Sequence, residues 1–341
     1  MEMFGKTAIL IVYIFVFAVL NLCASDLERI NGAGASFPAL IYRIWTYNYS
    51  KASGTEIEYH SIGSEAGLSQ LASGTVDFAA SDTPLNSAFL EKEDLVQFPM
   101  LIGGVVAAVN LSESGAIPLK LSPELLSRVF MGEIKEWNHP EIVSLNPDVP
   151  LPNRKITVVH RAEGSGTTWV FSKYLSSVSR EWRERMGSGK ILNWPGGIAA
   201  SNNSGVANYI KKISGSIGYV EYNYALGAGL KCVMFKNQSG NFVAPSLAAF
   251  KSAASSLDWK NISSYSDLFN SPKPDAWPLI GATYIIMKKK QSNPATTAEI
   301  LLFFKSCFEQ ESDEKLNYVP LPPNCVKKIE DSWIKTFFKT N

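Results

Sequence analysis

A pattern of strand, short polar turn and helix recurs along this chain, and it constrains the fold more than any other feature of the sequence. At its first occurrence, Arg29 and Ile30 lead into a turn over residues 31–38, and apolar residues then recur at helical spacing. Because Pro38 suits the first turn of a helix and Ser36 the capping position, this segment predicts a strand, a tight turn and a helix. The apolar residues with helical spacing are Leu40, Ile41, Ile44, Trp45 and Tyr49.

The pattern returns at residues 56–62, which are followed by Gly63 and Ser64, and at residues 155–160, which are followed by a polar turn over 161–167. Between them, residues 75–82 resemble a strand that ends in a carboxylate, and no internal repeat is visible. Strands that alternate with helices in this way predict an α/β fold.

Four polar turns therefore follow the carboxyl ends of predicted strands, which is the edge where open α/β sheets bind ligands. Two apolar stretches, 100–109 and 277–287, are the best candidates for strands that cross between two domains. If they cross, the first domain is discontinuous in sequence.

The charge balance limits the kind of partner. The 341 residues are enough for two domains, and 32 Lys and Arg against 31 Asp and Glu give a net charge of only +1. A generic nucleic-acid or membrane-surface binder needs a strong basic excess, so neither partner is expected. An anion bound by this chain must be held by local geometry.

The first 25 residues predict a signal peptide and therefore a periplasmic or extracellular location. Lys6 precedes an apolar run over 8–20, and small residues follow at Cys23, Ala24 and Ser25. A spanning helix is less favoured because the run is shorter than the ~20 apolar residues that a bilayer core requires. A lipid anchor at Cys23 is the alternative to simple cleavage, although Leu22 is bulkier than such processing usually accepts.

Beyond the leader, the chain shows no spacing typical of a metal site. Its remaining cysteines are Cys232, Cys307 and Cys325, of which the last two would close a modest loop if they were oxidised. The 3 histidines form no cluster, so neither a zinc site nor another cofactor is expected.

The segment Gly164–Thr167 is a candidate anion cradle. Its glycines let backbone N–H groups turn inward, a helix beginning there adds its positive end, and Ser165, Gly166 and Thr167 add donors. Such a segment alone is commonly only a loop and helix cap. Arg161 strengthens the hypothesis because its guanidinium can bind two oxygens of one tetrahedral anion, and Glu163 could orient it.

Three further turns supply candidates. Ser36 and Ser64 are each interpretable as helix N-caps, yet a cap leaves neighbouring amides free to face an anion. Phe37 is either a core residue or the donor of a backbone amide. Asp82 is the most informative: monohydrogen phosphate can donate its proton to a carboxylate, whereas sulfate has none and is repelled. A turn or cap role for Asp82 is the alternative.

Taken together, these residues resemble the periplasmic phosphate-binding proteins of ABC-type phosphate transporters. The resemblance covers essentially the whole chain after the leader and is specific through the joint occurrence of several segments. These segments are GAGASFPALIY at 32–42, IGS at 62–64, TVDFAASDTPL at 75–85, VVHRAEGSGTTWVF at 158–171, GSIGYVEYNYA at 215–225 and AWP at 276–278.

The resemblance implies a type II periplasmic-binding-protein fold, in which two α/β lobes joined by crossing strands enclose the ligand. It suggests one lobe from 26–105 plus 280–341 and another from 106–279. It also implies an exported monomer that delivers phosphate to a membrane permease. The residues implied to contact phosphate are Ser36, Phe37, Ser64, Asp82, Arg161, Ser165, Gly166 and Thr167.

Two positions depart from the family pattern: Ser36 stands where threonine is common, and Glu163 where aspartate is common. The first keeps the hydroxyl, whereas the longer arm of Glu163 could shift the Arg161 guanidinium.

The sequence does not favour an enzyme or a nucleotide-binding protein. An enzyme would use Ser165 with His160 as its base, but no Gly-x-Ser-x-Gly elbow surrounds Ser165, and no partner for the histidine is visible. Nucleotide binding lacks both the third glycine after Gly34 and the Walker spacing at 187–190. A phosphate sensor or scavenger without a transporter would present the same pocket, so the sequence leaves that alternative open.

Overall fold

The computed structural model describes residues 29–115, 117–257, 268–291, 293–310 and 315–338. The predicted signal peptide, including Cys23, lies outside these residues. Within them, no helix is both long enough and apolar enough to cross a bilayer.

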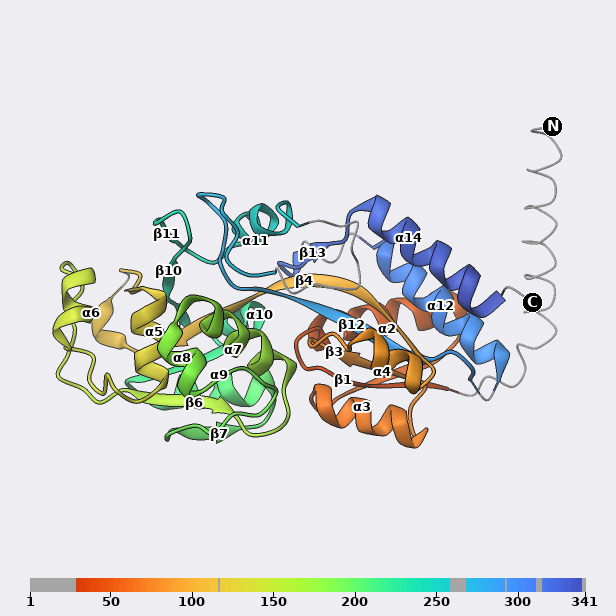
Figure 1. Cartoon of the computed structure of the whole chain (residues 1–341), viewed down its shortest axis with the longest axis horizontal. Helices are drawn as coiled ribbons and strands as arrows, with labels where there is room; N and C mark the ends of the chain where they lie inside the picture. The colour runs from red at the N-terminus through yellow and green to blue at the C-terminus, as the bar shows by residue number, and fades with distance from the viewer. Residues whose placement is uncertain (1–28, 116, 258–267, 292, 311–314, 339–341) are drawn as a thin grey trace.

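Two lobes lie side by side and are joined by two long strands (Figure 1). In the described ranges, one ten-stranded sheet runs through both lobes in the order β2-β1-β3-β12-β4-β8-β6-β7, with β13 and β9 also paired to β4. The predicted α/β class and the predicted crossing strands are confirmed. The two joining strands are β4 (Leu95–Val109) and β12 (Ile280–Lys288).

The first lobe combines the start of the chain with its end. Its strands β1, β2 and β3 are parallel, α12 packs against α2 and β3, and α14 lies beside α12 (Figure 1). Its elements are β1 (Ile30–Gly34), α2 (Ala39–Ser53), β2 (Ile57–Ser61), α3 (Ser64–Ser73), β3 (Phe78–Ser81), α4 (Ser87–Lys92), α12 (Pro294–Phe308), β13 (Val319–Pro320), α14 (Pro323–Trp333) and a π-helical turn (Ile334–Phe338).

The second lobe is built around the parallel strands β6, β7 and β8. A three-stranded sheet of β11, β10 and β5 lies apart from the main one. Its elements are a 3₁₀ turn (Ser112–Ser114), β5 (Lys120–Leu121), α5 (Pro123–Phe130), α6 (Pro140–Leu145), β6 (Thr157–Arg161), α7 (Gly166–Val178), α8 (Arg180–Arg185), β7 (Ile198–Ala200), α9 (Asn202–Lys212), β8 (Ser216–Glu221), α10 (Tyr222–Gly227), β9 (Lys231–Cys232), β10 (Met234–Lys236), β11 (Phe242–Val243) and α11 (Leu247–Ala254).

Helix α2 shows how local sequence sets the elements. Ile41, Trp45 and Tyr49 lie one turn apart and are buried, which fits the predicted spacing. The helix ends at Gly54, whose φ of 81° is a left-handed conformation that favours glycine. Pro38 takes the N-cap position rather than the first turn, and no side chain caps the helix. Ser36 is therefore not the cap of this helix.

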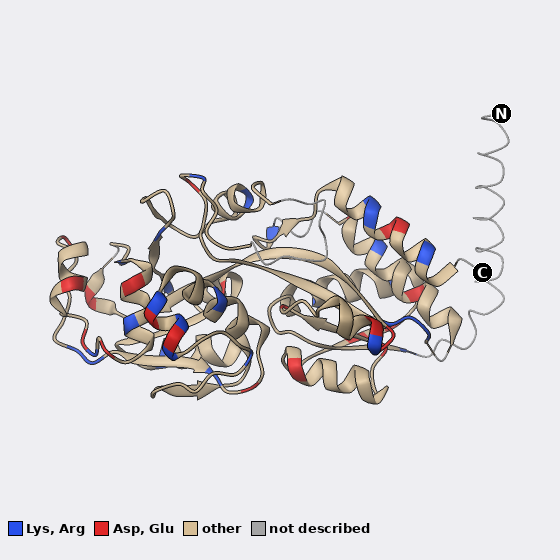
Figure 2. Ribbon diagram, viewed as in Figure 1, with Lys and Arg blue, Asp and Glu red and all other residues tan. Residues whose placement is uncertain are grey.

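Each lobe has an aromatic core, which makes it a stiff platform for the turns at its edge. In the first lobe, Phe78 contacts Phe304 edge-on, with ring centroids 5.1 Å apart. In the second, Phe171 stacks on Tyr219 at 4.4 Å. Charged residues of both signs are spread over the outer helices of both lobes (Figure 2), in agreement with the near-zero net charge.

Candidate functional site

The four polar turns meet where the two lobes face each other. The first three follow β1, β2 and β3 of the first lobe, and the fourth follows β6 of the second. The side chains that the sequence singled out there are buried although most are polar: Ser36 and Asp82 are each 2% exposed, Arg161 is 4% exposed, and Phe37, Ser64, Ser165 and Thr167 are fully buried. Buried polar groups need partners, so the contacts of this cluster define what it can bind.

Ser64 joins the two lobes through its hydroxyl. Its Oγ accepts from the backbone N–H of Asp82 at 3.4 Å and from that of Gly166 at 3.2 Å. Across the same interface, the Glu65 N–H donates to the Gly164 carbonyl at 3.2 Å. Ser64 is thus the first residue of α3, but its hydroxyl is directed at the site rather than used as a cap.

Gly166 is required by this close approach of the lobes. A Cβ atom at this position would lie 2.6 Å from both Ser64 Oγ and Asp82 Cβ, closer than such atoms are found. The absent side chain lets the backbone N–H at the start of α7 donate to Ser64 Oγ. The N-termini of α3, α7 and α9 all lie at this interface, and each adds a positive dipole end.

Arg161 is held by a carboxylate, as the sequence suggested. Its Nε donates to Glu163 Oε1 at 2.9 Å, its Nη2 contacts the same oxygen, and its Nη1 lies 3.4 Å from Thr167 Oγ1. Burial alone would raise the pKa of Glu163, but the charge and hydrogen bonds of Arg161 outweigh it and lower this pKa. The Asn202 N–H also donates to Glu163 Oε1, at 3.0 Å. Glu163 therefore remains charged and fixes the direction of the guanidinium.

Asp82 places a carboxylate among these donors. Its Oδ1 accepts from the Thr283 hydroxyl at 2.6 Å, and its Oδ2 lies 3.5 Å from the Thr167 hydroxyl. Burial raises the pKa of Asp82 to about 7, although Thr283, Arg161 and Thr167 oppose the shift. A carboxyl group with this pKa exchanges a proton near neutrality, so it can either accept or donate a hydrogen bond.

The remaining predicted residues lie in the same cluster. Ser165 is the N-cap of α7, with its Oγ accepting from the Thr168 N–H at 3.2 Å, so its hydroxyl has the capping role weighed in the sequence. The Phe37 ring is buried against Gly103 and Gly281 of the crossing strands, and the Phe37 carbonyl accepts from the Tyr318 hydroxyl at 2.8 Å. The Phe37 backbone is thereby fixed beside the site.

Several residues of the site were not found by sequence reasoning. Thr283 comes from β12 and lies 201 residues beyond Asp82 in the sequence. Asn203 at the start of α9 contacts both Ser36 and Thr167. The Tyr219 hydroxyl accepts from the Arg161 N–H at 3.1 Å and pairs with Thr168 Oγ1 at 2.7 Å. Tyr219 lies in the stretch at 215–225 that carries the resemblance and Thr283 in the apolar stretch at 277–287, but nothing in either pattern distinguishes these two positions.

The structure does not support an enzyme that uses Ser165 and His160. His160 stacks on Trp194, and its Nδ1 lies 3.0 Å from the Arg161 carbonyl, while the Ser165 hydroxyl serves α7. Burial lowers the pKa of His160. Among the residues that the structure describes, no group of three or more His, Cys, Asp or Glu side chains could hold a metal ion.

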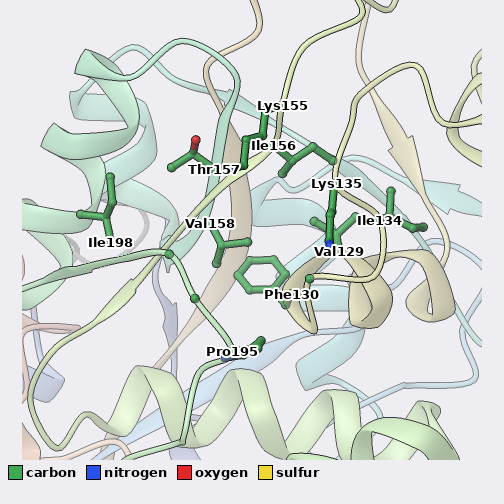
Figure 3. A pocket seen from close by; sticks show the side chains of 13 residues that line it. Val129, Phe130, Ile134, Lys135, Lys155, Ile156, Thr157, Val158, Pro195 and Ile198 are labelled. Atoms are coloured by element: carbon green, nitrogen blue, oxygen red, sulfur yellow. The ribbon is translucent and has the colours of Figure 1, made fainter.

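An open hollow of the described surface is a different feature. It has a volume of about 420 Å³ and lies in the second lobe, between α5 and the strands β6 and β7. Figure 3 shows Phe130, Val158, Pro195 and Ile198 around it. None of the predicted site residues lines it, so the candidate site is the enclosed cluster between the lobes.

The fold and this cluster define a class of protein: a two-lobed binding protein whose site, rich in hydrogen-bond donors, is enclosed between the lobes. The family model of the PBP superfamily domain matches residues 24–304. A phosphate-binding protein PstS from Xylella fastidiosa is 45% identical over 91% of this chain and 86% of its own length. A protein of the same name from Haemophilus influenzae is 42% identical over 94% and 96%.

The chain therefore belongs to the PBP superfamily and, within it, to the family of PstS phosphate-binding proteins, which are binding proteins and not enzymes. The fold is also that of a solved high-affinity periplasmic phosphate-binding protein (PfluDING) with bound phosphate. That structure has a TM-score of 0.72 at 21% identity and covers 89% of this chain and 94% of its own.

Proposed function

We propose that this protein binds one inorganic phosphate ion between its lobes, without chemistry, and delivers it to an ABC-type importer. The observation that carries the proposal is the placement of one proton-exchanging carboxyl group, Asp82, within a buried set of hydrogen-bond donors that includes Arg161. Phosphate is the common tetrahedral anion that needs both donors and an acceptor at neutral pH.

Two sets of donors would hold the anion. The first lobe contributes the turn at Ser36 and Phe37 and the hydroxyl of Ser64, and the second contributes the Arg161 guanidinium. The start of α7 completes the set with Ser165, Gly166 and Thr167. Because Ser165 Oγ already caps α7, its contribution is expected mainly from its backbone and from its O–H proton. Glu163 supports Arg161 and does not contact the ion.

Asp82 would supply the selectivity. Oδ1 is engaged by Thr283, whereas Oδ2 has only a long contact with Thr167 at 3.5 Å. The proton of monohydrogen phosphate can therefore lie between the ion and Oδ2. Sulfate brings no proton, so at a pH above the pKa of Asp82 it meets an unprotonated carboxylate and is repelled.

The lobe boundaries belong to the same proposal. We assign residues 26–105 and 280–341 to one lobe and 106–279 to the other, since β4 and β12 join the two groups of elements (Figure 1). Opening and closing would be a hinge motion through these two strands. Closure is favoured by the contacts of Ser64 and Glu65 with the 164–166 segment.

Export and partners complete the proposal. The similar PstS proteins are phosphate-binding proteins, and the first 25 residues have the composition of a signal peptide. We infer a monomer outside the cytoplasm that docks on a membrane permease, with cleavage near Ala24 or Ser25. A lipid anchor at Cys23 is the alternative to a free protein.

Isothermal titration tests the proposal. Mature protein, stripped of bound anion by unfolding and refolding, is titrated with phosphate and with sulfate at pH 8. One-to-one binding of phosphate with much weaker sulfate binding is expected. Folded protein that takes up neither ion, or takes up both equally, would refute it.

A further inference from the structure

Ser36 has a buried hydroxyl whose two acceptor positions are both occupied. Its Oγ accepts from the backbone N–H of Asn203 at 3.2 Å and from the side-chain Nδ2 of Asn203 at 3.0 Å. A hydroxyl has two lone pairs and one proton, so these two bonds leave only the O–H for a further partner. Within the described part of the chain, no hydrogen bond takes the Ser36 proton, although Ser36 is only 2% exposed.

The orientation of the Asn203 amide is fixed independently. Its Oδ1 accepts from the backbone N–H of Glu221 at 3.0 Å, so its Nδ2 must point toward Ser36 and Thr167. The side chain is fully buried, and Glu221 is itself held by two hydrogen bonds from Asn223. Asn203 is therefore a rigid donor that cannot turn to accept the Ser36 proton.

Asn203 also contacts both lobes. It belongs to α9 of the second lobe, yet it holds Ser36, which follows β1 of the first. The same Nδ2 lies 3.3 Å from Thr167 Oγ1, which in turn lies 3.5 Å from Asp82 Oδ2. One amide thus contacts a hydroxyl from each side of the site.

We propose that Asn203 is a positioning residue of the phosphate site, which sets the Ser36 hydroxyl as a donor toward the anion when the lobes are closed. It acts through Ser36 and does not itself contact phosphate. A donor that is already oriented loses less entropy on binding than a freely rotating hydroxyl. Together with Asp82 as the acceptor, this arrangement gives two polar turns of the first lobe opposite hydrogen-bonding roles. The inference rests on the proposed phosphate-binding function.

A double-mutant cycle on the anion-free full chain tests this role. Phosphate affinity is measured for the wild type, Asn203→Ala, Ser36→Ala and the double variant. A hydrogen bond to a charged group corresponds to about a tenfold to hundredfold change in affinity, so each single variant is expected to bind about tenfold or more weakly. If Asn203 acts through Ser36, adding Asn203→Ala to Ser36→Ala costs less than about threefold.

Asn146→Ala is the matched control. It removes another buried amide of the second lobe, whose Oδ1 accepts from the Lys120 N–H at 2.7 Å and whose Nδ2 donates to the Lys120 carbonyl at 2.9 Å, and which contacts neither Ser36 nor Thr167. Its phosphate affinity is expected to stay within about threefold of the wild type, and thermal unfolding of every variant verifies folding. If Asn203→Ala weakens binding equally in the presence and absence of the Ser36 hydroxyl, or if Asn146→Ala weakens it as much, the role of Asn203 is merely structural. A wild type that binds no phosphate would instead refute the proposed function.

Discussion

The Asp82→Asn variant gives the sharpest test of selectivity. Asparagine has the same shape and keeps an oxygen that can accept from Thr283, but it replaces the titrating oxygen by an N–H donor. It therefore behaves like permanently protonated Asp82 with respect to a sulfate ion. The comparison isolates the charge of one carboxyl group in an otherwise unchanged site.

The magnitude follows from the pKa of Asp82, which burial raises to about 7. At pH 8 only about one tenth of the anion-free wild-type molecules carry the proton, and at pH 9 about one hundredth. If sulfate binds only the protonated form, its affinity for the wild type falls about tenfold for each pH unit above 7. Asp82→Asn should then bind sulfate about tenfold more tightly than the wild type at pH 8 and nearly equally at pH 5.

The assay is isothermal titration with sulfate at pH 5, 7, 8 and 9, at constant ionic strength, with phosphate as the second ligand. Phosphate affinity should fall in the variant, because Oδ2 no longer accepts the proton of the ion. A wild-type sulfate affinity that does not change between pH 5 and 9 would refute the reasoning. The reasoning would also be refuted if, at pH 9, Asp82→Asn bound sulfate as weakly as the wild type does.

The Asp82 carboxyl group also makes the stability of the anion-free protein depend on pH. Its folded pKa, raised to about 7, lies above the ordinary value of 3.8, so the folded state holds the proton more tightly than the unfolded state. Stability is therefore lost as pH rises from about 4 to about 7, by up to about 4 kcal/mol. Asp82→Asn removes this part of the pH dependence, which denaturant unfolding at pH 5 and pH 8 measures as a smaller difference than in the wild type. Burial raises the pKa of Glu221 to about 8, and the charge of Asp82 adds to this rise. Asp82→Asn therefore also lowers the pKa of Glu221, which reduces the pH dependence in the same direction.

Three other variants test separate parts of the site. Arg161→Ala should weaken phosphate binding by about 2–5 kcal/mol, because a buried ion loses its charged partner and Glu163 is left unpaired; unchanged affinity in titration would remove Arg161 from the site. Gly166→Ala should weaken phosphate binding because its Cβ would lie 2.6 Å from Ser64 Oγ, and small-angle scattering with phosphate should show a more open molecule than the wild type. Thr283→Val removes the hydroxyl that lowers the pKa of Asp82, so the midpoint of the sulfate pH profile should move upward, and a downward shift would contradict the assigned hydrogen bond.

The sequence determined the architecture and most of the candidate residues, because both are encoded locally. Alternating periodicities of strand and helix predicted the α/β class, and the apolar runs predicted the strands observed as β4 and β12. Polar turns at strand ends must meet at one edge of a sheet, so Ser36, Ser64 and Asp82 could be grouped before any coordinates were known. The pairing of Arg161 with Glu163 could likewise be predicted, since only one residue separates them in sequence.

Only the tertiary structure decided what each polar group does. In the sequence, Ser64 and Ser165 are both candidate helix caps. Only the fold shows which N–H groups each hydroxyl contacts, and these contacts give Ser165 a capping role and Ser64 a different one. Asn203 and Thr283 follow no motif, because their partners come from distant segments that meet when the lobes pack together. The raised pKa of Asp82 results from its burial. Both lobes together create this burial when they are closed, so no single segment of the sequence could predict it.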